Sequence, residues 1–430
     1  MYKFKFQSML IAVAAIMTFA AISCDDDDDS KEPFKVAEKF AKGSGSQADP
    51  FVISNAGELA FLAQSTNDGT CGGYAEKYFI LTSDIDLDGI DWTPIGSYVF
   101  DENYEPDYSR IFMGYFDGQN HTVSNLKYSS SDLFVGAGLF GVVAGSLNNI
   151  ICKNFEINVT TAEGQAFGAL AGYCMGFADN CHAINAVVSG NACVGGLIGG
   201  SNICSITNSS STNASITILG DNDFSAGLIQ CDIAQCGGLL VGGAFGGAEG
   251  NSIFSDCKVS GKIEAYGNEP VGLGGITGSM MMIDVVKNCT VDVTIKTTKG
   301  GHAIGGLCGY AGTMSDPTPV YEVEGVTCTK YPAEFSDCNV TVTIDAPNAT
   351  HVGGLVGTPL YYYNQETAFN LTNCTVAGTI NNTVTPGAII GRANEGKITS
   401  CKVSVKVDGK AFDTEVGTTT TAYMSGDQGE

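Results

Sequence analysis

Residues 274–278 read Gly-Gly-Ile-Thr-Gly, and residues 288–295, ten residues further on, read Asn-Cys-Thr-Val-Asp-Val-Thr-Ile. In the second stretch the cysteine, the two valines and the isoleucine alternate with polar residues. This period of two is typical of a strand with one buried face. The glycine pentad predicts a sharp turn or a close approach of two backbones. Together the two stretches describe one unit of a β structure.

Both stretches recur along the chain, which is therefore an array of repeats. The pentad stands at 137–141, 168–172, 195–199, 242–246, 274–278, 305–309, 353–357 and 387–391. The cysteine signature stands at 256–259, 288–291, 337–340, 373–376 and 400–403. One such strand cannot bury its own apolar face, whereas parallel stacking of successive repeats buries all of them. The sequence therefore predicts an all-β parallel solenoid.

The composition agrees with a β solenoid and limits the function. Of 430 residues 56 are glycine, and charged residues make up 16% of the chain, where about 25% is usual. The glycines lack a three-residue period, which excludes collagen. Lys and Arg number 21 against 46 Asp and Glu, so the net charge is −25. A chain this acidic repels phosphate, and nucleic acid is excluded as a partner.

The pentads resemble the GLUG motif, which is named for its Gly-Leu-x-Gly core and occurs in large bacterial surface proteins. The preceding segment is similar to the lead-in of that family at 49–53, 81–87, 92–96 and 116–123. The resemblance covers residues 45–407. It implies a right-handed parallel β-helix, and it implies little about activity.

The first residues have the features of an export signal. Two lysines precede an apolar stretch at 9–22, which is short for a membrane span of about 20 residues. Residues 21–24, Ala-Ile-Ser-Cys, resemble the lipobox of bacterial lipoproteins. The resemblance implies a signal peptide at 1–23 and a lipid on the thiol of Cys24, through which the protein is held to a membrane. A plain secretory signal is the alternative.

Five aspartates follow Cys24 directly, at 25–29. Such a run repels itself and stays solvated, so we expect 24–44 to be an acidic tether or linker. The run also resembles the export signal of surface lipoproteins of the Bacteroidetes. That resemblance implies a lipid-anchored protein on the outer face of the outer membrane, and a tether without an export role is the alternative.

The body is expected to have three parts, which are an N-terminal cap with the first coils at 45–135, GLUG-type repeats at 136–411 and a flexible tail at 412–430. Asn55 and Glu58 have the spacing of a capping box and predict a short helix that covers the first coil. Charge along the last strand protects it against edge-to-edge pairing. This charge comes from Lys402, Lys406 and Lys410.

The chain has 16 cysteines, which in an exported protein ordinarily suggests disulfides. The repeats instead place six of them at equivalent inward positions, which are Cys181, Cys257, Cys289, Cys338, Cys374 and Cys401. Ile150 and Ser209 or Ser210 stand at the matching places of other coils, so this is a packing position. We expect a ladder of buried free thiols, because in-register parallel strands orient their Cβ atoms poorly for disulfides.

No motif indicates a metal, cofactor or catalytic site. Cys231 and Cys236 lack a companion pair and the four histidines are scattered, so no zinc site is expected. Residues 84–89 resemble the start of a calcium loop, but Ile95 stands where a bidentate Glu belongs. The preferred interpretation of these aspartates is the polar face of a strand. The H-E-x-x-H and G-x-S-x-G motifs are absent.

We therefore expect no enzyme activity. A glycan-cleaving enzyme on the same fold is the alternative, since polysaccharide lyases and hydrolases also use parallel β-helices. The paired carboxylates of such hydrolases have no recognisable counterpart in the repeats, and Arg392 is the sole arginine of the repeat region. A purely structural surface protein is the third possibility.

Two interruptions of the repeat form the candidate binding site. The cysteine signature is delayed after Gly309 and again after Thr358. Both insertions leave the coil at the same corner, so we expect them to be neighbours. The tyrosines expected there are Tyr310, Tyr321, Tyr331, Tyr361, Tyr362 and Tyr363. Exposed tyrosines can stack on sugars or anchor a protein, which predicts an adhesin-like protein for a host or microbial glycan or surface protein. Packing of the rings on the coil edge is the alternative.

Overall fold

The computed structural model describes most of the chain from residue 34 onward. The described residues are 34–99, 107–129, 136–160, 166–220, 235–245, 252–267, 271–281, 285–311, 333–359, 361–362, 365–366, 368–381, 383–384, 386–392, 395–420 and 425–427. The chain divides into Met1–Phe34 and one compact unit, Lys35–Glu430. All that follows concerns this second unit.

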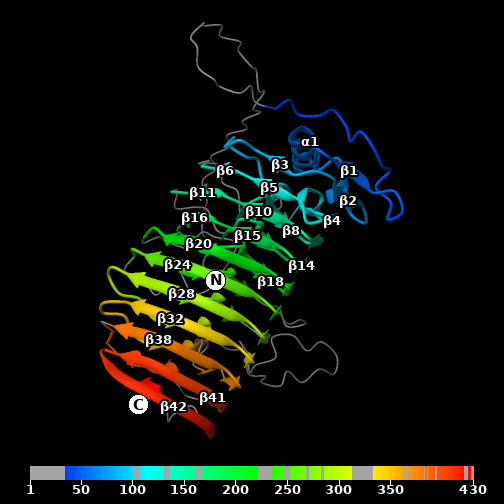
Figure 1. Ribbon diagram of the computed structural model, residues 1–430. Coiled ribbons are helices and arrows are strands. Elements are labelled where there is room, and N and C mark those ends of the chain that lie inside the picture. Colours follow the sequence, from blue (N-terminus) through cyan, green and yellow to red (C-terminus); the bar gives the residue numbers. More distant parts are fainter. Residues whose placement is uncertain are drawn as a thin grey trace, which may run out of the picture. The chain divides into compact units, whose positions relative to one another are not determined.

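The compact unit is a parallel β-helix with a single described α-helix, as the sequence predicts. Successive coils stack their strands side by side along the solenoid, from the N-terminal strands β1 and β2 to the C-terminal strands β41 and β42 (Figure 1). The strands form one sheet of 24, one of eight, one of nine and a separate pair. Each complete coil contributes to all three large sheets.

The 24-stranded sheet bends at a corner in the coils, so it forms two adjoining sides of the solenoid. We call these sides its first and second faces. The first face contains β1 (Phe51–Ile53), β2 (Tyr78–Leu81), β4 (Tyr115–Asp117), β9 (Ser146–Asn148), β14 (Phe177–Asp179), β19 (Ser205–Thr207), β23 (Ile253–Ser255), β27 (Val285–Lys287), β31 (Ala333–Ser336) and β37 (Ala368–Thr372). The second face contains β3 (Ile85–Asp86), β5 (Thr122–Ser124), β6 (Lys127–Tyr128), β10 (Ile151–Lys153), β11 (Glu156–Asn158), β15 (His182–Ile184), β16 (Val187–Gly190), β20 (Ser210–Ile218), β24 (Lys258–Ala265), β28 (Thr290–Thr297), β32 (Asn339–Asp345) and β38 (Thr375–Asn381). β41 (Glu395–Val407) runs through both faces.

The two smaller sheets meet at the glycine pentads. The eight-stranded sheet contains β7 (Gly136–Ala137), β12 (Ala166–Phe167), β17 (Cys193–Gly195), β21 (Gln235–Gly238), β25 (Val271–Gly274), β29 (Ala303–Gly305), β33 (Val352–Gly353) and β39 (Pro386–Gly387). The nine-stranded sheet contains β8 (Phe140–Val143), β13 (Ala171–Cys174), β18 (Ile198–Asn202), β22 (Val241–Phe245), β26 (Thr277–Met281), β30 (Cys308–Ala311), β34 (Val356–Pro359), β40 (Ile390–Arg392) and β43 (Ser425–Asp427).

Left-handed residues make the corner between the two faces of the large sheet. The residue before the inward position that holds the ladder cysteines has a positive φ, for example 52° at Asn288 and 56° at Asp337. Asn and Asp tolerate this conformation better than other residues with a side chain. The corner therefore explains why Asn or Asp precedes most of the signature cysteines.

The pentad glycines serve close packing rather than a left-handed turn. No glycine of 274–278 has a positive φ. A Cβ atom on Gly278 would lie 2.3 Å from the carbonyl oxygen of Gly272, and one on Gly274 would lie 2.2 Å from that of Thr277. Such distances are far inside van der Waals contact. Of the two explanations for the pentad, close approach of backbones is the correct one.

The helix α1 (Ala56–Asn67) lies at the N-terminal end of the stack (Figure 1). The side chain of Asn55 accepts a hydrogen bond of 3.0 Å from the backbone N–H of Glu58. The carboxylate of Glu58 accepts one of 2.8 Å from the backbone N–H of Ser54, one residue earlier than a standard capping box places it. Within the described residues, no helix is long and apolar enough to span a bilayer.

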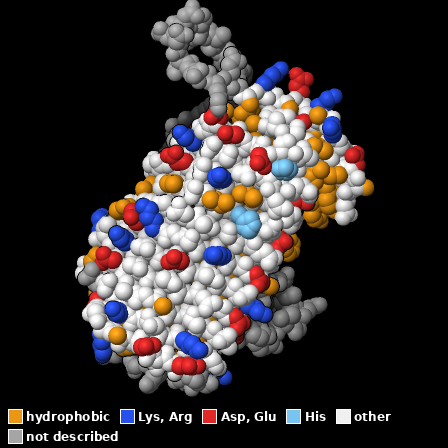
Figure 2. Space-filling view, in the orientation of Figure 1, with side chains coloured by type: hydrophobic (Ala, Val, Ile, Leu, Met, Phe, Trp, Pro, Cys, Tyr) orange, Lys and Arg blue, Asp and Glu red, His pale blue; other side chains and the backbone are white. Residues whose placement is uncertain are grey.

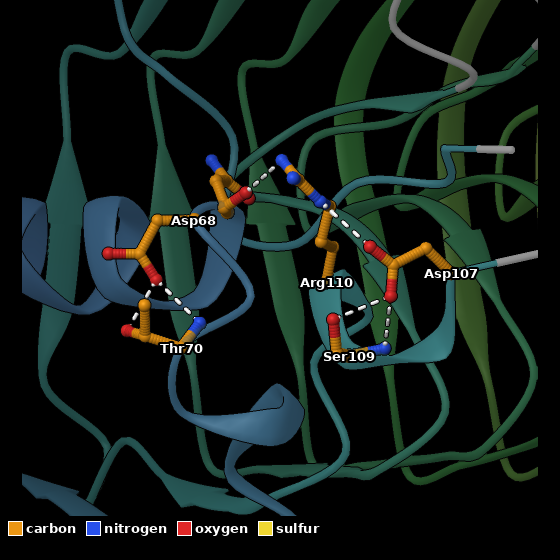
Figure 3. Close-up of polar contacts among 6 residues, drawn as sticks. Asp68, Thr70, Asp107, Ser109 and Arg110 are labelled. Atoms are coloured by element: carbon orange, nitrogen blue, oxygen red, sulfur yellow. Dashed lines mark hydrogen bonds and ion pairs between the residues drawn. The ribbon is translucent and has the colours of Figure 1, made fainter. Parts of the chain in front are cut away.

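Arg110 ties the loop before it to the end of α1 (Figure 3). It ends the 3-10 helix η2 (Tyr108–Arg110), and the other such helix is η1 (Gly72–Tyr74). The guanidinium donates to the backbone oxygen of Asn67 at 2.8 Å and to Asp107 at 2.9 Å. Hydrogen bonds from Ser109 and Arg110 hold the pKa of Asp107 below its ordinary value. A cation therefore satisfies a terminal carbonyl of the helix.

The C-terminal end differs from the loose tail expected at 412–430. Residues of β42 (Lys410–Thr420) form a long strand that pairs antiparallel with β41, with Val405 opposite Phe412 and Cys401 opposite Val416. Val416 is buried. The segment looked irregular because its apolar residues are few. Backbone pairing with the last coil, which does not depend on them, orders it instead.

Candidate functional site

Tyr310 is not exposed, although the sequence suggested that it belongs to an exposed cluster. Tyr310 lies on β30, in register between Ser279 and Thr358, and is only 7% exposed. Burial raises its pKa above the ordinary value. Tyr310 precedes the insertion, so it still belongs to the regular coil and packs over Gly272. The expectation that it is exposed for ligand binding is therefore wrong.

The two insertions do start side by side. Ala311, at the end of β30, is the register partner of Pro359 at the end of β34. Tyr361 and Tyr362 form β35 (Tyr361–Tyr362), which pairs antiparallel with β36 (Gln365–Glu366). Three of the expected binding residues, Tyr321, Tyr331 and Tyr363, lie outside the described residues, as does Cys24.

A row of outward side chains that includes three aromatic residues lies on the first face of the large sheet. The strands of consecutive coils pair in register there, so one outward position of each coil forms a row along the solenoid. We call this set the aromatic row: Tyr78, Tyr115, Ser146, Phe177, Ser205 and Ile253. In Figure 2 hydrophobic side chains gather over the N-terminal coils, whereas the C-terminal coils show scattered charges.

The large side chains of the aromatic row are exposed and available to a ligand. Tyr115 is 44% exposed, Phe177 is 61% exposed and Ile253 is 40% exposed. The rings of Tyr78 and Tyr115 stack with centroids 4.5 Å apart and planes inclined by 11°. This stacking holds Tyr115 in place. Ser146 and Ser205 flank Phe177 in the row, so no large neighbour in the row covers the ring of Phe177.

A second row of polar side chains runs beside the first. It lies two residues further along each strand, so it faces the same side, and it comprises Asp117, Asn148, Asp179, Thr207 and Ser255. We call it the polar row. Asp179 uses one carboxylate oxygen, Oδ1, to accept from Thr207 and from Asn208, the latter at 2.8 Å. Asp117 accepts from Asn149 at 2.8 Å. These contacts fix the carboxylates without removing them from solvent.

The aspartates at 84–89 take part in turns and strands instead of a calcium loop. Asp84 accepts from the backbone N–H of Thr122 at 2.9 Å and contacts the ring of His121 at 3.1 Å. These contacts, the backbone one first, lower the pKa of Asp84. Asp86 accepts from Asn125 at 2.8 Å, and the intervening Ile85 is buried. In the portion of the chain that the structure describes, no three His, Cys, Asp or Glu side chains are placed to hold a metal ion.

The ladder cysteines lie where the repeats place them. The strands that begin directly after the corner pair in register from coil to coil, so the residues before them form one column of buried side chains. This column contains Ile150, Cys181, Ser209, Cys257, Cys289, Cys338, Cys374 and Cys401. The thiol of Cys338 donates to the backbone oxygen of Ser336 at 3.2 Å. The neighbouring thiol of Cys289, together with burial, raises the pKa of Cys338 to about 12. Such thiols are unreactive at neutral pH.

A shallow depression of about 450 Å³ lies on the second face of the large sheet. It forms where the pairing of β20 with β24 shifts between Ser211 and Ala214, which is a β-bulge. Val187, 47% exposed, and Lys262 are among its lining residues. The depression is open and has few polar groups that converge, so the aromatic row is the stronger candidate for a binding site.

Sequence reasoning missed the aromatic row because it followed the insertions and the inward positions. A signal was present in the repeats. Phe177 and Ile253 each stand four residues before a ladder cysteine, Cys181 and Cys257. In these two coils the outward position holds a large apolar residue, whereas Asn370 and Lys397 stand at the same place in the last coils.

Comparison with known proteins gives one match to a family model, over a short segment of the chain. Residues 348–381 match the family model described as the GLUG motif. These residues include the pentad at 353–357 and the strand that begins after Cys374. The match thus falls on the motif that the sequence resembles.

Two individual proteins resemble the chain. Halomucin of Haloquadratum walsbyi is 31% identical over 180 residues, which cover 39% of this chain and 2% of Halomucin. The chain therefore spans a very small part of that relative. A Bacteroides ovatus protein described as a "putative immunoglobulin A1 protease" superposes with a TM-score of 0.51 at 19% identity, over 74% of this chain and 85% of that one. At this identity the likeness shows the fold alone.

Proposed function

We propose that the protein is a non-catalytic binding protein of the cell surface, which holds an extended glycan along the aromatic row. The observation that carries the proposal is the exposure of Tyr115 and Phe177 on one flat face, beside the polar row. Sugar rings present an apolar face and a rim of hydroxyl groups. Aromatic rings stack on the former, and carboxylates and amides accept hydrogen bonds from the latter.

The spacing of the coils suits a repeating ligand. Neighbouring parallel strands lie about 4.8 Å apart, so Tyr115 and Phe177, which are two coils apart, are separated by about 10 Å along the axis. This distance is comparable with two units of an extended polysaccharide. Both hydrogen bonds to Asp179 among the described residues go to its Oδ1 atom. Its Oδ2 atom can therefore accept a hydrogen bond from a sugar hydroxyl.

The proposed location is the outer face of the outer membrane, with a lipid on Cys24 as the anchor. The support comes from the residues around Cys24, which resemble a lipobox, and from the five aspartates after it. The net charge of −25 also suits a protein that must stay soluble beside an anionic cell surface.

A glycan array tests the binding proposal. The chain without its predicted signal peptide and lipid should bind a polysaccharide saturably. Replacement of Tyr115 or Phe177 by Ala should weaken binding about 3- to 10-fold each, because one aromatic stacking contact contributes about 0.5–1.5 kcal/mol. Tyr266→Ala is the matched control, since Tyr266 is 40% exposed but follows β24 on the other face.

Two results would contradict the proposal. Unchanged affinity in the Tyr115→Ala, Phe177→Ala double variant would exclude the aromatic row, and loss of binding in a Tyr361→Ala, Tyr362→Ala, Tyr363→Ala variant would place the site at the insertion instead. Release of sugar products, or cleavage of immunoglobulin A, would show an enzyme. Release of sugar products is the more informative of these two measurements, because Asp117 and Asp179 lie two coils apart in the polar row and glycoside hydrolysis uses a pair of carboxylates.

A further inference from the structure

Two cysteines outside the ladder lie in direct contact. Cys174 is the last residue of β13, and Cys204 lies one coil further on, directly before β19. Their sulfur atoms are 3.3 Å apart, and the thiol of Cys204 donates to that of Cys174. Both side chains are fully buried. Each ladder thiol from Cys257 to Cys401 donates to backbone carbonyl oxygens, and ladder thiols also interact with their neighbours along the column.

The backbone brings these two cysteines together across a corner. Cys174 is the register partner of Ser201, and Ile203, with a φ of 49°, turns the chain before Cys204. Cys204 is therefore not in register with Cys174, and the two side chains approach each other diagonally from neighbouring coils. A disulfide requires about 2.0 Å between the sulfurs, so an approach of about 1.3 Å from the 3.3 Å contact completes it. The diagonal geometry avoids the aligned Cβ atoms of the ladder.

We propose that Cys174 and Cys204 form a disulfide that links two successive coils in the exported protein. Each thiol gives up one proton and one electron, and a sulfur–sulfur bond forms. The two electrons and two protons pass to the disulfide of an oxidised thiol oxidoreductase, which becomes a dithiol. The reaction proceeds by thiolate attack through a mixed disulfide. Because both cysteines are buried in the folded coil, it takes place before the coils close.

The environment of the pair favours this chemistry over that of the ladder. In the folded coil the hydrogen bond from Cys204 lowers the pKa of Cys174, which reflects the direct contact of the two sulfur atoms. The pKa values of Cys338 and Cys374 are raised to about 12, first by the adjacent ladder thiol and then by burial. The diagonal contact of the two sulfur atoms, in place of the in-register positions of the ladder cysteines, makes the bond specific to this pair and leaves the ladder reduced.

The disulfide would also strengthen the proposed binding face. β14, which carries Phe177, begins three residues after Cys174, and β19 begins directly after Cys204. A bond between the two cysteines fixes the relative position of these neighbouring strands. The inference rests on the export part of the proposed function, because disulfides persist in oxidising compartments, and it does not depend on a glycan.

Peptide mapping tests the pair directly. The full chain is refolded in a glutathione redox buffer, alkylated under denaturing conditions without reductant and digested with pepsin. Trypsin is unsuitable, since no Lys or Arg lies between Lys153 and Lys258. We expect one linked peptide pair that contains Cys174 and Cys204, with Cys338 and Cys374 alkylated. Recovery of both Cys174 and Cys204 as alkylated thiols from folded protein would overturn the proposal.

A variant and a second source separate the possible outcomes. In Cys174→Ala, Cys204 should become alkylated, and Cys338→Ala should leave the linked pair intact as the matched control. Persistence of a bond at Cys204 in Cys174→Ala would show a different partner and contradict the assignment. Chain taken from its native cells should carry the same bond. A bond in refolded protein but not in cellular protein would contradict export while it upholds the pair.

Discussion

Asparagine and aspartate side chains at the corner hold one coil to the next. The amide of Asn288 donates to the carboxylate of Asp256 at 2.6 Å, and that of Asn373 donates to Asp337 at 2.7 Å. The first contact lowers the pKa of Asp256. Each residue thus does two things, because it adopts the left-handed conformation of the corner and bonds along the stack. Cysteine, the next residue, packs in the core and donates to a backbone oxygen of its own coil.

Replacement of Asn288 separates these two roles. Asn288→Ala should lower the free energy of unfolding by about 1–3 kcal/mol, since it combines left-handed strain with the loss of a hydrogen bond. Asn288→Gly should cost less, because glycine adopts the same φ freely. Chemical denaturation measures both. Equal losses in the two variants would show that the conformation of residue 288 is unimportant.

The glycine pentad determines how closely the two smaller sheets approach. At Gly278, the backbone oxygen of Gly272 and the backbone nitrogen of Gly237 lie where a Cβ atom would be, at 2.3 and 2.5 Å. Both atoms belong to the paired strands of neighbouring coils and cannot move independently. The aromatic row, by contrast, lies on an outer face and can vary without any effect on this packing.

Gly278→Ala should therefore destabilise the protein by about 1–3 kcal/mol or more, which is the range of overpacked interiors. Gly301→Ala is the matched control. At that position the nearest atom to a new Cβ is the end of the Ile304 side chain at 3.2 Å, which can rotate away. Thermal unfolding of both variants checks the difference. Similar melting temperatures would argue against the close-packing role of the pentad.

The ends of the solenoid are protected in different ways. At the N-terminal end the helix α1 and its capping residues cover the first coil. At the C-terminal end β42 pairs with β41 over residues 397–420. The edge of β41 is therefore covered by a paired strand, in addition to the lysine charge that the sequence suggested. Lys402 of β41 lies opposite Glu415 of β42. An unpaired last coil would be a template for another chain.

Removal of β42 should make the protein self-associate. A chain that ends at Asp408 exposes the backbone edge of β41, whereas a chain that ends at Thr420 keeps it covered. We expect dimers or larger species for the shorter chain only, as measured by light scattering after size exclusion. Purely monomeric behaviour of the shorter chain at high concentration would show that the lysines of β41 are sufficient protection.

Much of the fold could be predicted from local patterns, and the candidate binding site could not. The alternation around Cys289 and the capping pair Asn55 and Glu58 identify strand and helix, because each depends on neighbours in sequence. Tyr310 shows the limit. It stands beside an insertion in sequence, yet its exposure depends on Gly272 one coil away. A local sequence pattern does not indicate a contact between residues of different coils.

The sequence by itself determined the repeat, the inward parity of each strand and the buried thiol column, because a period of two with recurring glycines leaves parallel stacking as the way to bury the apolar faces. Tertiary structure alone decided three further features. These are the row that joins Tyr115 to Phe177, the contact of Cys174 with Cys204 and the order of β42. The first two depend on register between successive coils, which sets neighbours across the stack, and the third depends on antiparallel pairing of β42 with β41.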